Sequence, residues 1–305
     1  MITESLKNLP TSVKIMEVGP RDGLQNEKTI IDTEQKIQFI ENLVDAGIKR
    51  IEVTAFVSPR WIPPLADQLE VVLGIKKKPG ASYAALVPNA KGYERAVGTG
   101  KIDEISFVIA ASDTHNQKNL NADTKAVLER YREVAYLATR DRIPFRVYLS
   151  CAFGCPYENK VSTRKIISLT KQMLELGAYE VALSDTIGIA SPRDTMNILA
   201  QVLQVVKKEE LALHMHDTRG MALANIWIAL LMGIASFDSA VGGLGGCPYA
   251  PGASGNVATE DLVNMLNSVG IQTDISIESL VKVSQTMAVL LKKAPAAKMA
   301  AMCRS

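Results

Sequence analysis

The chain has 305 residues, with 34 Lys and Arg against 32 Asp and Glu, so its formal net charge is only +2. This near-balance provides no general attraction to nucleic acid or to an anionic membrane surface, and we expect neither as a partner. Hydrophobic residues make up 47% of the chain, which excludes an intrinsically disordered protein and is ample for a large buried core. No run of about 18 apolar residues occurs, so no membrane-spanning helix is expected.

The cysteines and the chain ends bear on cellular location. A large chain with few cysteines is typical of a reduced, cytosolic protein, and this chain has Cys151, Cys155, Cys247 and Cys303. The first two are separated by three residues, which matches neither a redox C-x-x-C motif nor half of a zinc knuckle. Residues 1–12 contain no apolar stretch, and the last three residues are not a peroxisomal signal. We therefore expect a cytoplasmic protein.

Short apolar or β-branched runs alternate along the chain with longer amphipathic runs. The predicted strands span residues 14–18, 50–54, 82–86, 104–109, 145–149, 180–184, 211–214 and 236–240. The predicted helices span residues 34–46, 65–77, 90–99, 124–141, 163–176, 192–207, 221–232 and 259–268. Ser191-Pro192 is a helix-start signal, and Gly47 and Gly177 stand where helices are expected to end.

This alternation predicts an α/β fold with a parallel sheet and helical crossovers. Eight strand–helix units within about 270 residues favour a closed (β/α)8 TIM barrel over an open, doubly wound sheet. The open sheet would need a glycine-rich phosphate turn after the first strand, and residues 19–23 do not have the G-x-G-x-x-G pattern. We predict one domain over residues 1–305, with the barrel from about 13 to 270 and extra C-terminal helices from about 271 to 305.

In such barrels the chemistry lies on the loops that follow the strands. The first strand runs directly into Arg21 and Asp22, which are enclosed by glycine and proline. A surface salt bridge in a turn is the structural alternative for this pair. Glu52 stands in the middle of the apolar second strand, where an unpaired carboxylate is unfavourable. We expect it to pair with Arg21 or to support a metal site.

The seventh strand ends in His214 and His216, two of only three histidines in the chain. In a strand, residues i and i+2 point to one face, so both imidazoles are directed to the same place. Two such histidines at the mouth of a barrel have the spacing of metal ligands. A single buried histidine would more often be structural.

A glycine-rich loop, residues 242–256, follows the eighth strand and has Cys247 near its centre. This cysteine could move over the site as the loop closes; alternatively, the loop binds phosphate and the cysteine is incidental. Asn256 closes the loop, with a helix N-cap as its structural alternative. Asp185 follows the sixth strand, where a turn or helix cap is the alternative.

Two imidazoles with the Asp22 carboxylate and the Asn256 amide oxygen form a mixed nitrogen and oxygen donor set without thiolate. Such a set favours Mg²⁺ or Mn²⁺ with open coordination positions over a closed structural zinc site. The ion would act as a Lewis acid, and Arg21 would stabilise an enolate or alkoxide nearby. This combination suits cleavage or formation of carbon–carbon bonds by aldol or Claisen chemistry.

Three segments carry a resemblance to a known family: residues 21–27, 214–218 and 243–250. The sequence resembles the 3-hydroxy-3-methylglutaryl-CoA lyases from about residue 13 to residue 302. These enzymes belong to the metal-dependent TIM barrels that also include Claisen-condensing synthases, which lack the cysteine loop. The resemblance implies cleavage of 3-hydroxy-3-methylglutaryl-CoA to acetyl-CoA and acetoacetate, and a homodimer or homotetramer in which Cys303 could contact a partner chain.

The resemblance also implies the ligand set and the support around it. The expected ligands of Mg²⁺ or Mn²⁺ are Asp22, His214, His216 and Asn256. Glu52 is expected to support both the cation and Arg21. The cation is expected to chelate the thioester carbonyl and the C3 hydroxyl of the substrate.

The division of catalytic work comes from the family as well. A base near the metal, Asp22 or His214, is expected to remove the hydroxyl proton, after which the C2–C3 bond breaks. Arg21 is expected to steady the enolate of acetyl-CoA, with Cys247 as the acid when its loop closes. Asp185 is expected to position groups or to relay a proton.

One segment departs from the family pattern. In the loop predicted for residues 111–119, Asp113 and His115 stand where Glu and an aromatic residue are expected. This leaves open a longer 3-hydroxy-3-acylglutaryl-CoA as substrate. Two other readings compete: a Claisen-condensing synthase, which would carry a C-terminal regulatory extension and lack Cys247, and a non-catalytic binding protein, which would have lost the ligands.

Overall fold

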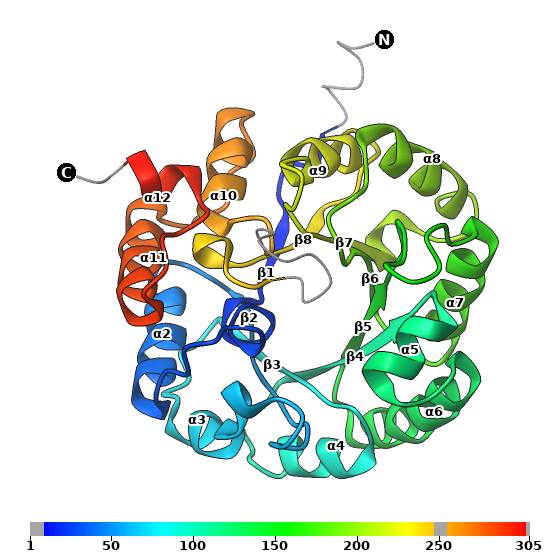
Figure 1. Ribbon diagram of the computed structural model, residues 1–305, viewed down its shortest axis with the longest axis horizontal. Coiled ribbons are helices and arrows are strands. Elements are labelled where there is room, and N and C mark those ends of the chain that lie inside the picture. The colour runs from blue at the N-terminus through cyan, green and yellow to red at the C-terminus, as the bar shows by residue number, and fades with distance from the viewer. Residues whose placement is uncertain (1–8, 247–254, 303–305) are drawn as a thin grey trace.

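The computed structural model describes residues 9–246 and 255–302, and within them eight parallel strands close into a barrel (Figure 1). Each strand pairs with the next one along the chain, and the last pairs with the first, with Lys14 opposite Ser236. The predicted (β/α)8 barrel is therefore confirmed. The strands are β1 (Lys14–Glu17), β2 (Arg50–Ala55), β3 (Ser82–Leu86), β4 (Glu104–Ala110), β5 (Phe145–Ser150), β6 (Glu180–Asp185), β7 (Leu211–Met215) and β8 (Ser236–Ser239).

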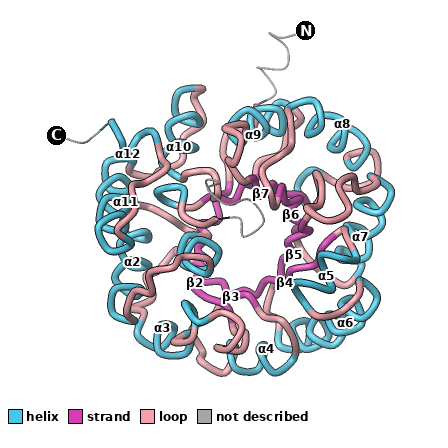
Figure 2. Tube along the Cα trace, in the orientation of Figure 1, coloured by secondary structure: helices cyan, strands magenta, loops and turns pink. Residues whose placement is uncertain are grey.

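Helices form an outer layer around the strands (Figure 2). Several begin at polar caps that satisfy the first free N–H groups; Asp32 and Gln35 form a reciprocal capping box, as do Ser191 and Asp194. The helices that follow the strands are α2 (Thr33–Asp45), α3 (Gln68–Gly74), α4 (Ala90–Val97), α6 (Thr124–Asp141), α7 (Thr163–Glu175), α8 (Pro192–Val202), α9 (Ala222–Leu231) and α10 (Thr259–Ser268).

The predicted loop over residues 111–119 was wrong, because helix α5 (Asp113–Leu120) lies there. Ser112 caps its start by accepting a hydrogen bond from the backbone N–H of His115. The helix is polar around most of its circumference, so the apolar period that reveals the other helices is missing. The helix predicted over 65–77 is shorter, since the two prolines of the 3-10 turn Pro63–Leu65 precede it.

Successive side chains along each strand alternate between the helical outer layer and the barrel interior. Odd-numbered positions of β4 face the helices, where Phe107 stacks on Tyr131 with ring centroids 4.6 Å apart. The opposite positions point into the barrel, where aliphatic side chains usually dominate. Here they include buried charged and polar groups: Glu52, Glu104, Ser106, Arg146, Tyr148, Glu180, His214 and Asp238. The barrel interior is therefore held together to a large extent by ion pairs and hydrogen bonds.

The chain after the barrel forms α11 (Ile277–Leu291) and α12 (Lys298–Met302), which agrees with the predicted C-terminal helices. Helix α11 packs beside α2 and α10, closing the outer layer where the chain began (Figure 1). The backbone N–H of Ser276 donates to the carbonyl of Ala46 at this junction. In the part of the chain that the structure describes, no helix combines the length and the apolar character that a membrane span requires.

Candidate metal centre and active site

The segment after β1 is a five-residue π-helical turn, η1 (Gly19–Gly23), that carries Arg21 and Asp22 into the barrel mouth. Two glycines permit this path. A Cβ on Gly19 would lie 2.6 Å from a carboxylate oxygen of Glu17. A Cβ on Gly23 would lie 2.9 Å from the Cβ of Leu244. The turn therefore packs tightly between the end of β1 and the loop that follows β8.

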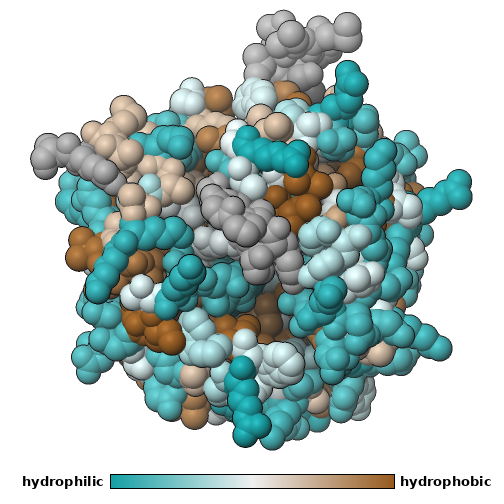
Figure 3. Space-filling model, in the orientation of Figure 1, coloured by the Kyte–Doolittle hydropathy of each residue, from teal (hydrophilic) through white to brown (hydrophobic). Residues whose placement is uncertain are grey.

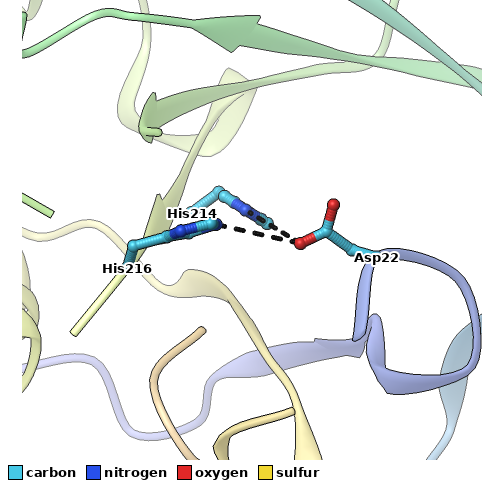
Figure 4. Close-up of side chains that lie close together, drawn as sticks. All are labelled: Asp22, His214 and His216. Atoms are coloured by element: carbon cyan, nitrogen blue, oxygen red, sulfur yellow. Dashed lines mark ion pairs between the residues drawn. The ribbon is translucent and has the colours of Figure 1, made fainter. Parts of the chain in front are cut away.

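Asp22 faces the two histidines at the end of β7 (Figure 4). Its Oδ2 atom lies 3.9 Å from Nε2 of His214 and 3.8 Å from Nε2 of His216. One donor atom of each residue lies within 4.8 Å of the others. Two ligands about 2.1 Å from an octahedral Mg²⁺ are themselves about 3–4 Å apart, so this spacing is that of donors around one divalent cation.

Asn256 completes this group. Its Nδ2 donates to Oδ2 of Asp22 at 2.8 Å and to the Leu244 carbonyl at 3.2 Å. Its Oδ1 is buried and accepts no hydrogen bond from any described residue, and Nδ1 of His216 is in the same condition. An amide oxygen without a partner beside a carboxylate and two imidazoles fits a cation ligand. Asn256 is not the helix cap that was the alternative, since α10 begins after Ala258.

Arg21 lies beside the ligands and pairs with two acidic groups through Nε and Nη1. Its Nη1 donates to Oδ1 of Asp22 at 2.6 Å, and its Nε donates to Glu52. The hydroxyl of Ser106 donates to the other oxygen of Glu52, which has no exposed surface. The guanidinium carbon also lies 5.0 Å from the ring centroid of Tyr148. Arg21 and Asp22 therefore form a buried, oriented pair instead of a surface salt bridge.

The electrostatics of this pair favour charged forms on both sides. Burial favours neutral Asp22, but Arg21 and the two histidines outweigh it and hold the pKa of that carboxyl well below its usual range. Burial likewise lowers the pKa of Arg21, whereas Glu52 and Asp22 raise it above its ordinary value. A carboxylate with so low a pKa is a good cation ligand and a weak base.

Asp185, at the end of β6, is buried, and its carboxylate accepts hydrogen bonds from the loop that follows the strand. Its carboxylate accepts hydrogen bonds from the backbone N–H groups of Ile189 at 3.1 Å and Ala190 at 2.8 Å. Its backbone carbonyl accepts from the N–H of His216 at 3.3 Å. Burial raises its pKa, with these backbone hydrogen bonds acting in the opposite direction. The structure thus shows Asp185 shaping a turn and supporting the backbone of a histidine; a relay role stays a prediction.

The two residues of α5 that depart from the family pattern, Asp113 and His115, have different surroundings. Asp113 lies toward the surface, where its carboxylate pairs with Lys165 at 2.8 Å and accepts from Thr124. His115 is buried, with its ring centroid 6.2 Å from that of Tyr157, and burial lowers its pKa. Asp113 therefore makes polar contacts at the protein surface, whereas His115 is buried.

Cys247 lies outside the described residues, but both ends of its loop are described. Gly245 has φ of +114°, and a Cβ on Gly255 would lie 2.5 Å from the carbonyl carbon of Gly245. The two ends therefore touch, and only glycine permits this contact. Asn26 of the segment after η1 donates to the Gly246 carbonyl at 3.4 Å. The two described ends of the loop that contains the predicted acid thus lie beside the candidate metal centre.

The sequence reasoning overlooked three groups around the ligands. Gln25 donates to Oδ1 of Asp22 at 2.7 Å. Asp238 lies 3.2 Å from Nδ1 of His214, and Tyr148 contacts the same imidazole edge-on with centroids 5.6 Å apart. A signal for Asp238 was available, because it is a carboxylate in the middle of a predicted strand, as Glu52 is.

Comparisons with known proteins agree with this geometry. Residues 12–287 match the family described as HMGL-like. A mitochondrial hydroxymethylglutaryl-CoA lyase of Gallus gallus is 51% identical over 271 residues, covering 89% of this chain and 91% of the relative. The crystal structure of HMG-CoA lyase from Bacillus subtilis superposes with a TM-score of 0.96 at 45% identity, covering 97% of this chain and 99% of that one.

A third relative was solved with ligands. The HMG-CoA lyase from Acinetobacter baumannii, in complex with coenzyme A and 3-methylmalate, has a TM-score of 0.91 at 40% identity and covers 97% of this chain and 96% of its own. The similarity thus extends over nearly the whole sequence and over the barrel that assembles the ligands. The chain belongs to the hydroxymethylglutaryl-CoA lyase family.

Proposed function

We propose that this protein is a divalent-metal-dependent lyase that cleaves 3-hydroxy-3-methylglutaryl-CoA into acetyl-CoA and acetoacetate. The observation that carries the proposal is the convergence of Asp22, His214 and His216 beside the buried guanidinium of Arg21. One side of the site offers donors for a cation, and the other offers a fixed positive charge. A substrate anion that forms between them would be stabilised from both sides.

Asp22, His214, His216 and Asn256 would hold Mg²⁺ or Mn²⁺. When bound, such an ion supplies Lewis-acid polarisation of substrate oxygens. Among the described residues, Oδ1 of Asn256 accepts no hydrogen bond and the clustered donors include no thiolate, which supports a hard or borderline cation.

The remaining residues prepare the site for charge that develops during cleavage. Glu52 and Asp22 fix the guanidinium of Arg21, so it can stabilise the enolate of acetyl-CoA with little rearrangement. In this proposal a base beside the cation, Asp22 or His214, takes the proton of the C3 hydroxyl. Cys247 supplies the acid in this proposal, and Asp185 keeps His216 in place through its backbone.

The substrate class is an acyl-CoA thioester. The family membership and the coenzyme A in the Acinetobacter baumannii relative support it. Figure 3 views the molecule from the side of Figure 1: hydrophilic residues dominate the rim of this face, and hydrophobic residues are visible in the hollow at its centre. A longer 3-hydroxy-3-acylglutaryl-CoA is the second candidate, and the buried His115 on α5 is the feature that motivates it.

A substrate panel tests the proposal. The purified enzyme is given a series of 3-hydroxy-3-acylglutaryl-CoA thioesters with Mg²⁺, with Mn²⁺, and with excess chelator, and release of acetyl-CoA is followed. We expect turnover of the 3-methyl compound that stops with chelator and returns on addition of either ion. Condensation of acetyl-CoA with 2-oxo acids, in place of cleavage, would identify a synthase and contradict the proposal.

Cys247 is tested separately. We expect Cys247→Ala to lower kcat by orders of magnitude, because the product enolate loses its proton donor, while Mn²⁺ affinity changes little. Unchanged turnover would remove Cys247 from the role of acid. The intact metal affinity serves as the control that the variant is folded around its ligands.

Two further proposals concern assembly and location. We propose a homodimer or homotetramer, which light scattering coupled to gel filtration measures directly. We also propose a cytosolic location, supported by the buried, free thiols of Cys151 and Cys155. Fractionation of the native cells with an antibody against the protein would contradict it if the protein were found in an organelle.

A further inference from the structure

A second carboxylate lies behind one of the two histidines and does not belong to the candidate ligand set. Asp238, on β8, is buried inside the barrel, and its Oδ2 lies 3.2 Å from Nδ1 of His214. The Nε2 atom of the same ring lies 3.9 Å from Asp22. The imidazole is therefore placed between two carboxylates, one at each nitrogen. A neutral imidazole carries one N–H, so it can donate a hydrogen bond to only one of them.

Asp238 is itself held from the other side by a buried guanidinium. Its Oδ1 lies 2.9 Å from Nη1 of Arg146, a residue with no exposed surface. Nε of Arg146 lies 3.0 Å from Oε1 of Glu180, which in turn lies 3.4 Å from Arg50. Ion pairs therefore continue from His214 across the barrel interior. The contact between Arg146 and Asp238 has the distance of an ion pair without the geometry of a hydrogen bond, and the attraction of the guanidinium for Oδ1 leaves Oδ2 facing the imidazole.

A neutral imidazole carries its proton on one nitrogen and presents a lone pair on the other. A carboxylate accepts hydrogen bonds and cannot donate one, so the neighbour of Asp238 must carry the proton on Nδ1. The lone pair of Nε2 is then directed toward Asp22 and His216. His216 has no comparable arrangement, because its Nδ1 is buried without a hydrogen-bond partner among the described residues.

We propose that Asp238 is a positioning residue that holds His214 in the Nδ1–H tautomer, with its Nε2 lone pair presented to the metal centre. This inference rests on the proposed function only in that Nε2 is the nitrogen that meets the cation. The carboxylate acts through the histidine and touches neither cation nor substrate.

The amide variant Asp238→Asn reverses this logic without changing the size of the side chain. Arg146 can only donate, so it takes the amide oxygen, and the amide NH₂ is left facing Nδ1 of His214. That nitrogen must then accept, which places the proton on Nε2 and removes the lone pair from the metal centre. We expect Mn²⁺ affinity to fall by roughly 10- to 100-fold, as is usual when such an outer partner is lost.

The competing explanation is that Asp238 only neutralises Arg146 inside the barrel. Glu180→Gln is the matched control, because Glu180 is the other buried carboxylate on Arg146 and is not paired with either histidine. A purely structural role predicts that the two variants behave alike. The positioning role predicts that only Asp238→Asn changes the tautomer of His214.

The experiment uses full-length protein labelled with ¹⁵N-histidine, whose three imidazoles give separable ring signals. The ring ¹⁵N shifts are recorded without metal, and Mn²⁺ binding is then titrated without substrate by electron paramagnetic resonance. Support consists of Nδ1–H for His214 in the wild type and in Glu180→Gln, Nε2–H in Asp238→Asn, and a loss of Mn²⁺ affinity confined to the latter.

Three results would overturn the proposal: Nε2–H at His214 in the metal-free wild type, an unchanged tautomer in Asp238→Asn, or equal losses of affinity in both variants. The first needs no variant, so the test does not depend on whether Asp238→Asn folds. None of the measurements contains a thioester. A failure of the lyase proposal would appear in the substrate panel while these spectra stayed as expected, so the two failures are distinguishable.

Discussion

Replacement of Glu17 by Gln should make the stability of this protein less dependent on pH. Glu17, the last residue of β1, has no exposed surface. One carboxylate oxygen accepts from the backbone N–H groups of Gly19 at 2.8 Å and Val241 at 3.1 Å, and the other accepts from the hydroxyl of Thr259 at 2.6 Å. The residue thus joins three segments that carry or flank the candidate site.

The magnitude follows from the pKa of this carboxyl. Burial raises the pKa of Glu17 to about 8 from an ordinary value of 4.5, although the three hydrogen bonds act in the opposite direction. A difference of this size corresponds to about 5 kcal/mol of differential stability. The folded protein holds a proton that the unfolded chain releases above pH 4.5, so the contribution is complete below that pH and is lost as pH rises toward 8.

The amide in Glu17→Gln has no proton to lose. Its oxygen can still accept from Gly19 and Val241, and its NH₂ can donate to the hydroxyl of Thr259. We therefore expect the variant to have a smaller decline in the free energy of unfolding between pH 5 and 9 than the wild type. A decline should persist, since burial also raises the pKa of Glu260 to about 7.

The assay is urea unfolding at a series of pH values and constant ionic strength, in chelator so that metal binding does not contribute its own pH dependence. Glu278→Gln is the control: Glu278 is exposed, and Lys282 lowers its pKa below the ordinary value of 4.5, so the variant should keep the wild-type decline between pH 5 and 9. Parallel curves for wild type and Glu17→Gln would refute the reasoning, because they would mean that Glu17 takes up no extra proton on folding.

Three further outcomes are expected. His216→Ala should lower Mn²⁺ affinity at least about tenfold by removing one donor, and calorimetry showing wild-type affinity would exclude it from the ligand set. Gly23→Ala adds a Cβ 2.9 Å from the Cβ of Leu244, so we expect a loss of roughly 1–3 kcal/mol in urea unfolding. In the Leu244→Gly background, where the opposing Cβ is absent, the same substitution should cost less, and an equal cost in both backgrounds would contradict the clash. Lys36→Met removes the buried Lys36 ammonium from a partly buried ion pair with Asp67 and should destabilise by about 2 kcal/mol. Lys78→Met, at an exposed pair, should change stability by less than about 1 kcal/mol, and equal effects in thermal unfolding would show that burial is not the cause.

The sequence was sufficient for features that arise from local periodicity. Alternating apolar runs and amphipathic runs predicted the strands and most of the helices, because burial on one face repeats every 2 or 3.6 residues. The same reasoning placed His214 and His216 on one side of a strand. Helix α5 escaped because it is polar around most of its circumference, so no such period marks it.

Only the tertiary structure decided which distant groups meet. Asp22 and Asn256 are 234 positions apart in the chain and are hydrogen-bonded, because closure of the barrel brings β1 beside β8. The same closure decides that Asp238 faces His214, and that the charges of Arg146 are compensated inside the barrel. Periodicity indicates the face on which a side chain lies; the partner on that face depends on the register and closure of the whole sheet, which no single segment contains.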